Sequence, residues 1–445
     1  MSGSARRDRQ AGAGGETAGA EGAAGAGSGN GAEGAALAAE TAARQSYGRL
    51  LAWLAARSRD LAAAEDALAE AFAAALATWP HKGVPRNPEG WLAVAARRQL
   101  IGAARHAAVA ARAQPVLALL DEERLYGAES MRDDANLPDE RLKLMFAVAH
   151  PAIDAKMHAP LMLQCVLGFD AAAIARACVV PPATMGQRLS RAKAKIRTAR
   201  IPFALPDAAD LPARLDPVLD AIYAAFGLAW HDPDGRRDLT EEALWLGDLL
   251  ARRMPHRAEA QGLVALMRFA HARADARRDG AGRFVPLDAQ DTALWDAALI
   301  ARAQADLARA AALRQPGRFQ LEAAIQAVHV DRAETGRIDW TALAALYRML
   351  WRLAPTLSTL CGQAAVLIRL GDPGAALARL DTAAGAATGA AAYQPWWAVR
   401  AAALRALRRH QEAREAARQA AALAQDRATR DWLYEKAGRD GRDRQ

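Results

Sequence analysis

The chain has 445 residues, enough for about three domains, and a net charge of +8 that is compatible with a nucleic-acid partner without requiring one. Apolar residues make up 52% of it and aromatic residues only 6%, and no apolar run is long enough to cross a membrane. Because alanine is abundant while β-branched and aromatic residues are sparse, we expect helices nearly everywhere and an all-α fold.

Residues 1–36 consist mostly of Gly, Ala, Ser and Glu, with almost no large apolar side chain. Such a segment buries too little apolar surface to offset the entropy of ordering it, so we expect a disordered tail. From residue 37 to residue 113 the apolar residues recur at helical spacing, which predicts a first helical domain.

That domain contains two clear helical segments. The first ends near Trp79 and Pro80 in a breaker-rich loop, and the second starts with Asn87 as N-cap. The expected apolar face of the first segment consists of Leu61, Leu68, Phe72, Leu76 and Trp79. Its acidic residues lie off that face, namely Asp60, Glu65, Asp66 and Glu70.

Residues 114–137 lose helical periodicity and are expected to form a linker, after which residues 138–200 predict a helix-turn-helix. Asp170 is placed to cap a short helix, and Pro182 to begin the next one. The packing stripe of that second helix is predicted to be Met185, Leu189, Ala192 and Ile196. Its other faces carry six cations and no acid: Arg188, Arg191, Lys193, Lys195, Arg197 and Arg200. This layout is typical of a helix that enters a DNA major groove.

Residues 201–440 form a long helical region in which the basic character fades. Segment 367–380 aligns with segment 404–417 at an offset of 37 residues, which pairs Ala376 with Ala413. Small residues at helix crossings, repeated with a period in the mid-thirties, predict tetratricopeptide-like helical hairpins.

Several blocks of sequence, taken together, carry a family resemblance. The segments DLAAAEDALAEAF, WPHKGVPRNPEGWL and AARRQLIGAARH resemble the region-2 domain of extracytoplasmic-function sigma factors of RNA polymerase. The segments DERLKLMFAVAHPAI and RLSRAKAKIRTARIP resemble their region-4 domain. The continuation, from PFALPDAADLPARLDPVLDAIYAAF to PGRFQLEAAIQAVH, is similar to the extension of a subgroup with a tetratricopeptide-like domain behind region 4.

The resemblance implies a subunit that binds core RNA polymerase, through its β′ clamp helices and β flap, and directs it to promoter DNA. The residues that would contact the clamp helices are Asp60, Glu65, Asp66 and Glu70. The residues that would melt and read the −10 element are Trp91, Arg97, Arg98, Gln99 and Arg105. In the −35 major groove, base edges would face Thr184, Gln187, Arg188 and Arg191, and phosphates would be held by Lys193, Lys195 and Arg197. The C-terminal domain would be regulatory, with a protein or ligand of its own.

The chain departs from the family pattern at several positions. Gly102 and Ala103 stand in the stretch where Ile-Asp-Arg is usual, and Ala147-Val148-Ala149 replaces a cysteine-bearing segment. Ala173 and Pro182 stand where acidic residues are common. We expect these changes to affect promoter preference and −10 engagement more than the fold.

Other roles stay open for the same residues. Trp91 follows its helix cap closely enough to be a core residue, and the acids can form an ordinary solvated face. The alternative function is a helical-repeat interaction scaffold whose sigma-like half no longer acts at promoters. We expect neither an enzyme nor a bound cofactor or metal, because the nine histidines form no HExxH pair and no nucleophile motif occurs. The three cysteines show no disulfide or zinc spacing, which favours a cytoplasmic protein.

Overall fold

The computed structural model describes residues 26–111, 139–178, 180–230, 237–386 and 389–439. These residues form helices joined by turns and short loops, and their one β contact is a bridge between Arg278 and Phe284. The predicted all-α fold is therefore confirmed. No helix in these ranges is both long and apolar enough to cross a membrane.

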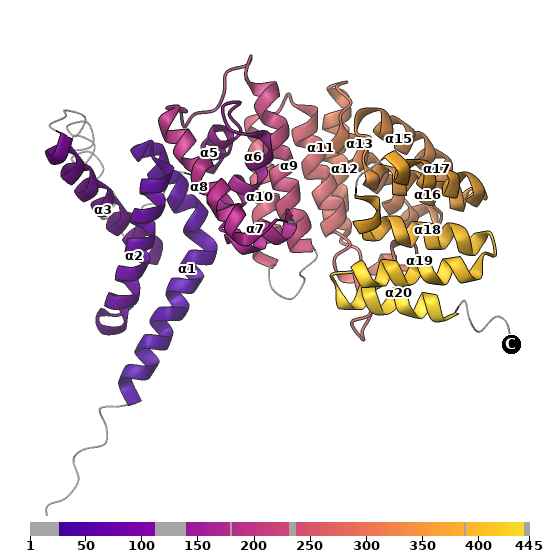
Figure 1. Ribbon diagram of the computed structural model, residues 1–445, viewed down its shortest axis with the longest axis horizontal. Coiled ribbons are helices and arrows are strands. Elements are labelled where there is room, and N and C mark those ends of the chain that lie inside the picture. Colours follow the sequence, from indigo (N-terminus) through magenta and orange to yellow (C-terminus); the bar gives the residue numbers. More distant parts are fainter. Residues whose placement is uncertain (1–25, 112–138, 179, 231–236, 387–388, 440–445) are drawn as a thin grey trace, which may run out of the picture. The chain divides into compact units, whose positions relative to one another are not determined.

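The chain divides into two compact units, residues 1–141 and 142–445. The first contains three helices, drawn in indigo and purple in Figure 1: α1 (Ala26–Ser58), α2 (Leu61–Lys82) and α3 (Pro88–Ala111). Each of the three packs against the other two. As predicted, Asn87 caps α3, because its Oδ1 accepts a hydrogen bond of 2.8 Å from the Gly90 amide. The predicted linker, 114–137, lies outside the described residues.

The start of α1 corrects the expectation of a disordered tail over residues 1–36. The helix begins at Ala26, inside that segment, and Ala35 is only 1% exposed. Alanine has the highest helix propensity of all residues, and small side chains let neighbouring helices approach. The composition was therefore compatible with a packed helix, although it lacks large apolar residues. Residues 1–25 lie outside the described ranges.

The expected apolar face of α2 is only partly correct. Leu61, Leu68 and Trp79 are buried as predicted, whereas the Leu76 side chain is 50% exposed. The helix also continues through Pro80 to Lys82 and ends at Gly83, whose φ of 85° suits glycine. Leu76 is consequently not part of the buried face of the helix.

The second unit begins with the predicted helix-turn-helix region and continues directly into the C-terminal helices. Its first seven helices are α5 (Arg141–Val148), α6 (Ala155–Leu167), α7 (Ala171–Ala177), α8 (Pro182–Thr198), α9 (Leu211–Trp230), α10 (Arg237–Arg253) and α11 (Ala258–His271). Helix α6 packs against α7 and α8 and also against α9. Through α6, the DNA-binding candidate is continuous with the helices that follow residue 201.

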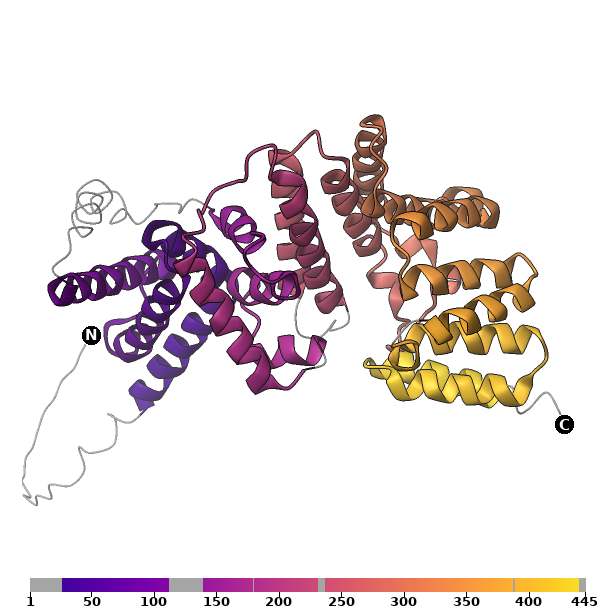
Figure 2. The ribbon, with the colours of Figure 1, turned by 45° about the horizontal axis from the view of Figure 1, so that its top comes forward.

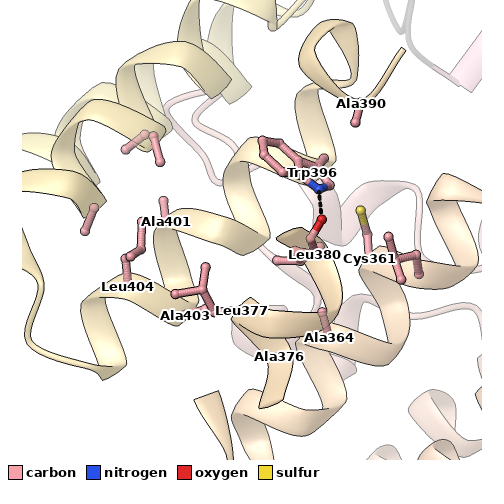
Figure 3. Packing of buried hydrophobic residues seen from close by; sticks show 14 residues of the cluster. Cys361, Ala364, Ala376, Leu377, Leu380, Ala390, Trp396, Ala401, Ala403 and Leu404 are labelled. Atoms are coloured by element: carbon pink, nitrogen blue, oxygen red, sulfur yellow. Dashed lines mark hydrogen bonds between the residues drawn. The ribbon is translucent and has the colours of Figure 1, made fainter. Parts of the chain in front are cut away.

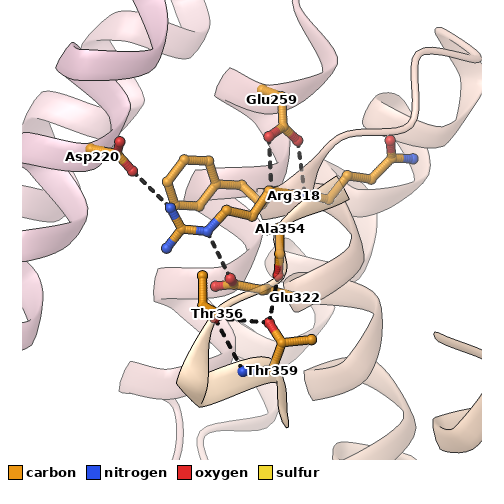
Figure 4. A network of polar contacts seen from close by, with 9 residues as sticks. Asp220, Glu259, Arg318, Glu322, Ala354, Thr356 and Thr359 are labelled. Atoms are coloured by element: carbon orange, nitrogen blue, oxygen red, sulfur yellow. Dashed lines mark hydrogen bonds and ion pairs between the residues drawn. The ribbon is translucent and has the colours of Figure 1, made fainter. Parts of the chain in front are cut away.

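The next helices of this unit are α12 (Ala297–Ala312), α13 (Arg318–Val330), α14 (Arg332–Thr335) and α15 (Trp340–Leu353). Polar contacts fix the start of α13, as Figure 4 shows. The Glu259 carboxylate accepts hydrogen bonds of 3.0 Å from the amides of Phe319 and Gln320, two donors that the helix itself leaves unpaired. The Arg318 guanidinium pairs with Asp220 at 2.8 Å and with Glu322 at 2.9 Å. The N-terminus of α13 is thereby tied to α9 and α11.

The last five helices form an antiparallel stack, in orange and yellow in Figure 2: α16 (Leu357–Arg369), α17 (Pro373–Ala386), α18 (Gln394–Ala406), α19 (His410–Leu423) and α20 (Arg427–Arg439). Both ends of α16 are offset by 37 residues from those of α18, and both ends of α17 by 37 from those of α19. The predicted repeat of helical hairpins is therefore confirmed. Figure 3 shows the core between the two hairpins, where Trp396 donates a 3.3 Å hydrogen bond to the Leu380 carbonyl.

Candidate nucleic-acid interface

The turn between α7 and α8 is built as the sequence predicts. The Asp170 Oδ1 accepts a 2.6 Å hydrogen bond from the Ala173 amide and so caps α7. Pro181 has extended geometry, with φ of −61° and ψ of 140°, and Pro182 is the first residue of α8. The Met185 amide then donates to the Pro181 carbonyl at 3.1 Å. The two prolines thus begin α8, four residues after α7 has ended at Ala177.

The apolar residues of helix α8 are buried, and most of its basic residues are exposed. The four residues of the predicted stripe are buried, with exposed fractions of 8% or less: Met185, Leu189, Ala192 and Ile196. Four of its five cations are exposed, and Lys193 is half-buried. Arg200, expected on the same helix, instead follows its end at Thr198 and is also exposed. Among the described residues, no carboxylate pairs with Arg188, Arg191 or Lys195, so their charges are available to an external anion. Gln187 is exposed and Thr184 half-buried near the start of the helix.

The candidate −10 residues on α3 do not share one environment. The rings of Trp91 and Trp79 lie edge to face, with centroids 5.5 Å apart, and Trp91 is half-buried. Arg98 and Arg105 are exposed and follow Trp91 at intervals of seven residues, which places them along one side of the helix. Gln99 is exposed and Arg97 half-buried on neighbouring faces. Trp91 therefore packs on its own unit, while Arg98 and Arg105 are exposed.

The four acids predicted to contact polymerase also divide. Asp60 is the N-cap of α2, and its Oδ1 accepts hydrogen bonds from the amides of Ala62 and Ala63 at 3.1 and 3.2 Å. Asp66 and Glu70 are exposed and one turn apart, whereas Glu65 is half-buried. The structure thus brings two of the four carboxylates together on an open helix face and gives Asp60 a role in the fold.

Comparison with known proteins places the chain in a family. Residues 214–311 match a family of unknown function (DUF6596). An uncharacterized protein of Rhizobium meliloti (strain 1021) is 36% identical over 394 residues, which cover 87% of this chain and 91% of that protein. The chain belongs to the family of this rhizobial protein. No solved structure matches it.

The segment that matches the family of unknown function includes most of α9 to α12. The sequence did not predict the contact of this segment between Glu259 and the start of α13. Glu259 holds the start of α13 only because Gly317 precedes that helix, since a Cβ there would collide with the Glu259 carboxylate. Burial raises the pKa of Glu259, while the amides of Phe319 and Gln320 oppose this effect. A glycine directly before a helix start was the available signal, but the sequence does not show which distant carboxylate uses it.

Proposed function

We propose that this chain is a promoter-specificity subunit of RNA polymerase, which binds the core enzyme and recognises −35 and −10 elements through separate helices. The observation that carries the proposal is α8, a helix that follows a short turn and whose apolar stripe is buried while four of its five cations are exposed. A helix of this kind fits the major groove, where Arg can bind guanine and Gln adenine through paired hydrogen bonds. The C-terminal helices are proposed to regulate this activity.

The roles within α8 follow from position along the helix. Gln187, Arg188 and Arg191 lie in its first three turns, where recognition helices contact base edges, together with Thr184. Lys193, Lys195 and Arg197 lie further along and would hold phosphates, which position the helix without specifying sequence.

The first unit supplies the other two proposed contacts. Arg98 and Arg105 would follow the backbone of the −10 strand, because opening a duplex requires cations along the displaced phosphates. We assign Trp91 to support of α3, since its ring already packs against Trp79. Asp66 and Glu70 would form the surface that contacts core polymerase.

The test is reconstituted transcription with bacterial core RNA polymerase and fragmented DNA of the source genome, followed by mapping of transcript starts. We expect starts that share two motifs at a fixed spacing and that disappear in the double variant Arg188→Ala, Arg191→Ala. The matched control is Arg302→Ala, Arg379→Ala, which removes the same charge from exposed positions of α12 and α17. If the chain produced no starts and did not bind core polymerase, the interaction scaffold would be the better function.

A further inference from the structure

Helix α15, labelled in Figure 1, packs against α13 and α16 and leaves one side exposed. The residues of that side recur at helical spacing, namely Thr341, Ala345, Arg348, Met349, Arg352 and Leu353. The helix contains no acidic residue, and Arg348 and Arg352 pair with no carboxylate among the described residues. Met349 and Leu353 are large apolar residues, yet they are 47% and 53% exposed. A face that combines unpaired arginines with exposed apolar side chains is typical of a protein-binding surface.

Apolar exposure distinguishes α15 from the other basic helix, α8. The large apolar residues of α8 are all buried, namely Met185, Leu189 and Ile196, so its exposed side offers charge without apolar surface. Charge alone suits phosphates. Because α15 adds two large apolar side chains to its charge, it favours a protein as its partner.

A complementary face is present on helix α2 of the same chain. Asp66 and Glu70 are exposed and pair with no cation among the described residues. The basic residues of α2 are confined to its last turn, more than two turns beyond Glu70. Ala69 and Ala73 are exposed close to the acids, and such small side chains allow another helix to approach.

We propose that the chain self-associates through these two faces, with α15 of one copy packed against α2 of a second copy. Arg348 and Arg352 are four residues apart, and so are Asp66 and Glu70, so that two ion pairs can form at once along one pair of helices. Opposite charges arranged in this way select the partner and its register.

The apolar side chains add to this contact. Met349 and Leu353 lie beside the arginines and would cover the small Ala69 and Ala73, which removes apolar surface from water. A single pair of helices buries less than about 1,200 Å², so we expect a weak association, with a dissociation constant roughly in the micromolar range.

The association has a consequence for the proposed function, because it would occupy the two carboxylates that are proposed to contact core polymerase. Self-association and polymerase binding would then compete for α2. This consequence rests on the proposed function, whereas the association itself does not. Measuring association without polymerase therefore tests it alone, and a chain that associates but does not bind polymerase would contradict only the proposed function.

The test is sedimentation velocity of the full chain at about 1–100 µM and low salt. The sedimentation coefficient of the wild type should rise with concentration. Two charge-reversal variants, Arg348→Glu with Arg352→Glu and Asp66→Arg with Glu70→Arg, should each associate at least about tenfold more weakly, because like charges would then face each other. An equimolar mixture of the two variants should regain the association, because the reversed α15 of one matches the reversed α2 of the other and their unchanged faces also match.

The matched control is Arg302→Glu with Arg379→Glu, which makes the same change in net charge at exposed positions of α12 and α17 and should associate as the wild type does. Arg188→Glu with Arg191→Glu tests α8 as the alternative partner of the acids. A loss of association in this variant that exceeds the loss in the α15 variant would overturn the assignment to α15.

Thermal unfolding of each variant separates loss of the contact from loss of the fold. All four reversed positions are exposed, so the unfolding temperatures should stay within a few degrees of that of the wild type. Recovery of association on mixing also requires both variants to be folded. The proposal would be overturned by a wild type that stays monomeric up to about 100 µM, or by folded variants that do not regain association when they are mixed.

Discussion

Gly371 and Arg408 occupy the same position in successive helical hairpins, and both have positive φ, 89° and 61°. Each follows the last turn of its hairpin's first helix, and the residue after it donates a hydrogen bond back into that helix. These bonds run from Asp372 to Leu367 at 3.0 Å and from Arg409 to Leu404 at 2.9 Å. The same backbone turn is therefore made by a glycine in one hairpin and by an arginine in the next.

This pairing predicts opposite effects for reciprocal substitutions. A non-glycine residue at positive φ costs about 1 kcal/mol or more, so Arg408→Gly should raise the free energy of unfolding by about 0.5–1 kcal/mol. Gly371→Ala should lower it by about 1 kcal/mol, because a Cβ there meets no atom within 4 Å and the cost is conformational alone. Urea unfolding of the full chain measures both. If Arg408→Gly instead lowered the free energy of unfolding, contacts of the Arg408 side chain would stabilise the fold by more than its positive φ destabilises it.

The hairpins and α8 could be predicted from the sequence because their signals are local. A repeat of 37 residues and an apolar stripe at Met185, Leu189, Ala192 and Ile196 follow from spacing alone. The caps at Asn87 and Asp170 are likewise determined by residues three positions away.

The remaining features depend on contacts between distant segments. The start of α13 requires Glu259, which lies 60 residues before Phe319 in the chain, and no local pattern specifies that contact. The exposure of Leu76 similarly depends on where α1 and α3 cover α2. The role of Asp60 could not be decided from the sequence for another reason. An acidic residue at the start of a helix can either cap the helix or contact a partner protein, and its position in the sequence is the same in both cases.

Asp60→Asn separates these two roles. Asparagine caps a helix about as well as aspartate, so the variant should keep the free energy of unfolding to within about 0.5 kcal/mol, whereas Asp60→Ala should lose about 1 kcal/mol. We expect Asp60→Asn to keep its affinity for core polymerase, while Asp66→Asn with Glu70→Gln should weaken binding several-fold. Urea unfolding and polymerase binding, both measured on the same samples of each variant, separate the effect on stability from the effect on affinity. A loss of polymerase affinity in Asp60→Asn at unchanged stability would assign this carboxylate to the docking surface as well.

The proposed phosphate contacts of α8 predict a salt dependence. If about four of the six cations of α8 and the adjoining Arg200 contact phosphates, the logarithm of the affinity for duplex DNA should fall with the logarithm of salt concentration with a slope of about −3.6. Lys195→Gln should reduce the slope by about 0.9 and leave sequence preference unchanged, whereas Arg188→Ala should relax preference at one base pair by about 1–3 kcal/mol. Fluorescence anisotropy on the mapped −35 duplex measures both quantities. Arg418→Gln, on the exposed face of α19, serves as the control.

Two glycines in helices should respond oppositely to alanine. At Gly262 in α11, a Cβ would lie 2.6 Å from the Gln320 nitrogen and 2.8 Å from its Cα, so α13 would have to move away. Gly262→Ala should therefore destabilise the second unit by about 1–3 kcal/mol. At Gly102 in α3 a Cβ meets nothing within 4 Å, and Gly102→Ala should stabilise the first unit by about 1 kcal/mol through helix propensity. Hydrogen exchange, which reports each unit separately, distinguishes the two effects, and unaltered protection at α13 in Gly262→Ala would contradict the close crossing.

His329 predicts a pH dependence of stability. Its pKa is lowered from 6.5 to about 4 in the folded chain by burial and by Arg273 and Arg332, against the opposing charge of Asp288. Between these two pH values the unfolded chain binds the proton more readily, so this group's contribution is intact above pH 6.5 and is lost as the pH falls toward 4. The loss is on the order of 3 kcal/mol.

His329→Gln, which cannot titrate, should remove this component while leaving the lowered pKa values of His150 and His158 to act equally in both proteins. The free energy of unfolding, measured in urea at pH 7, 6 and about 5, should therefore fall less steeply in the variant than in the wild type. Parallel curves would mean that His329 has a similar pKa in the folded and unfolded chains.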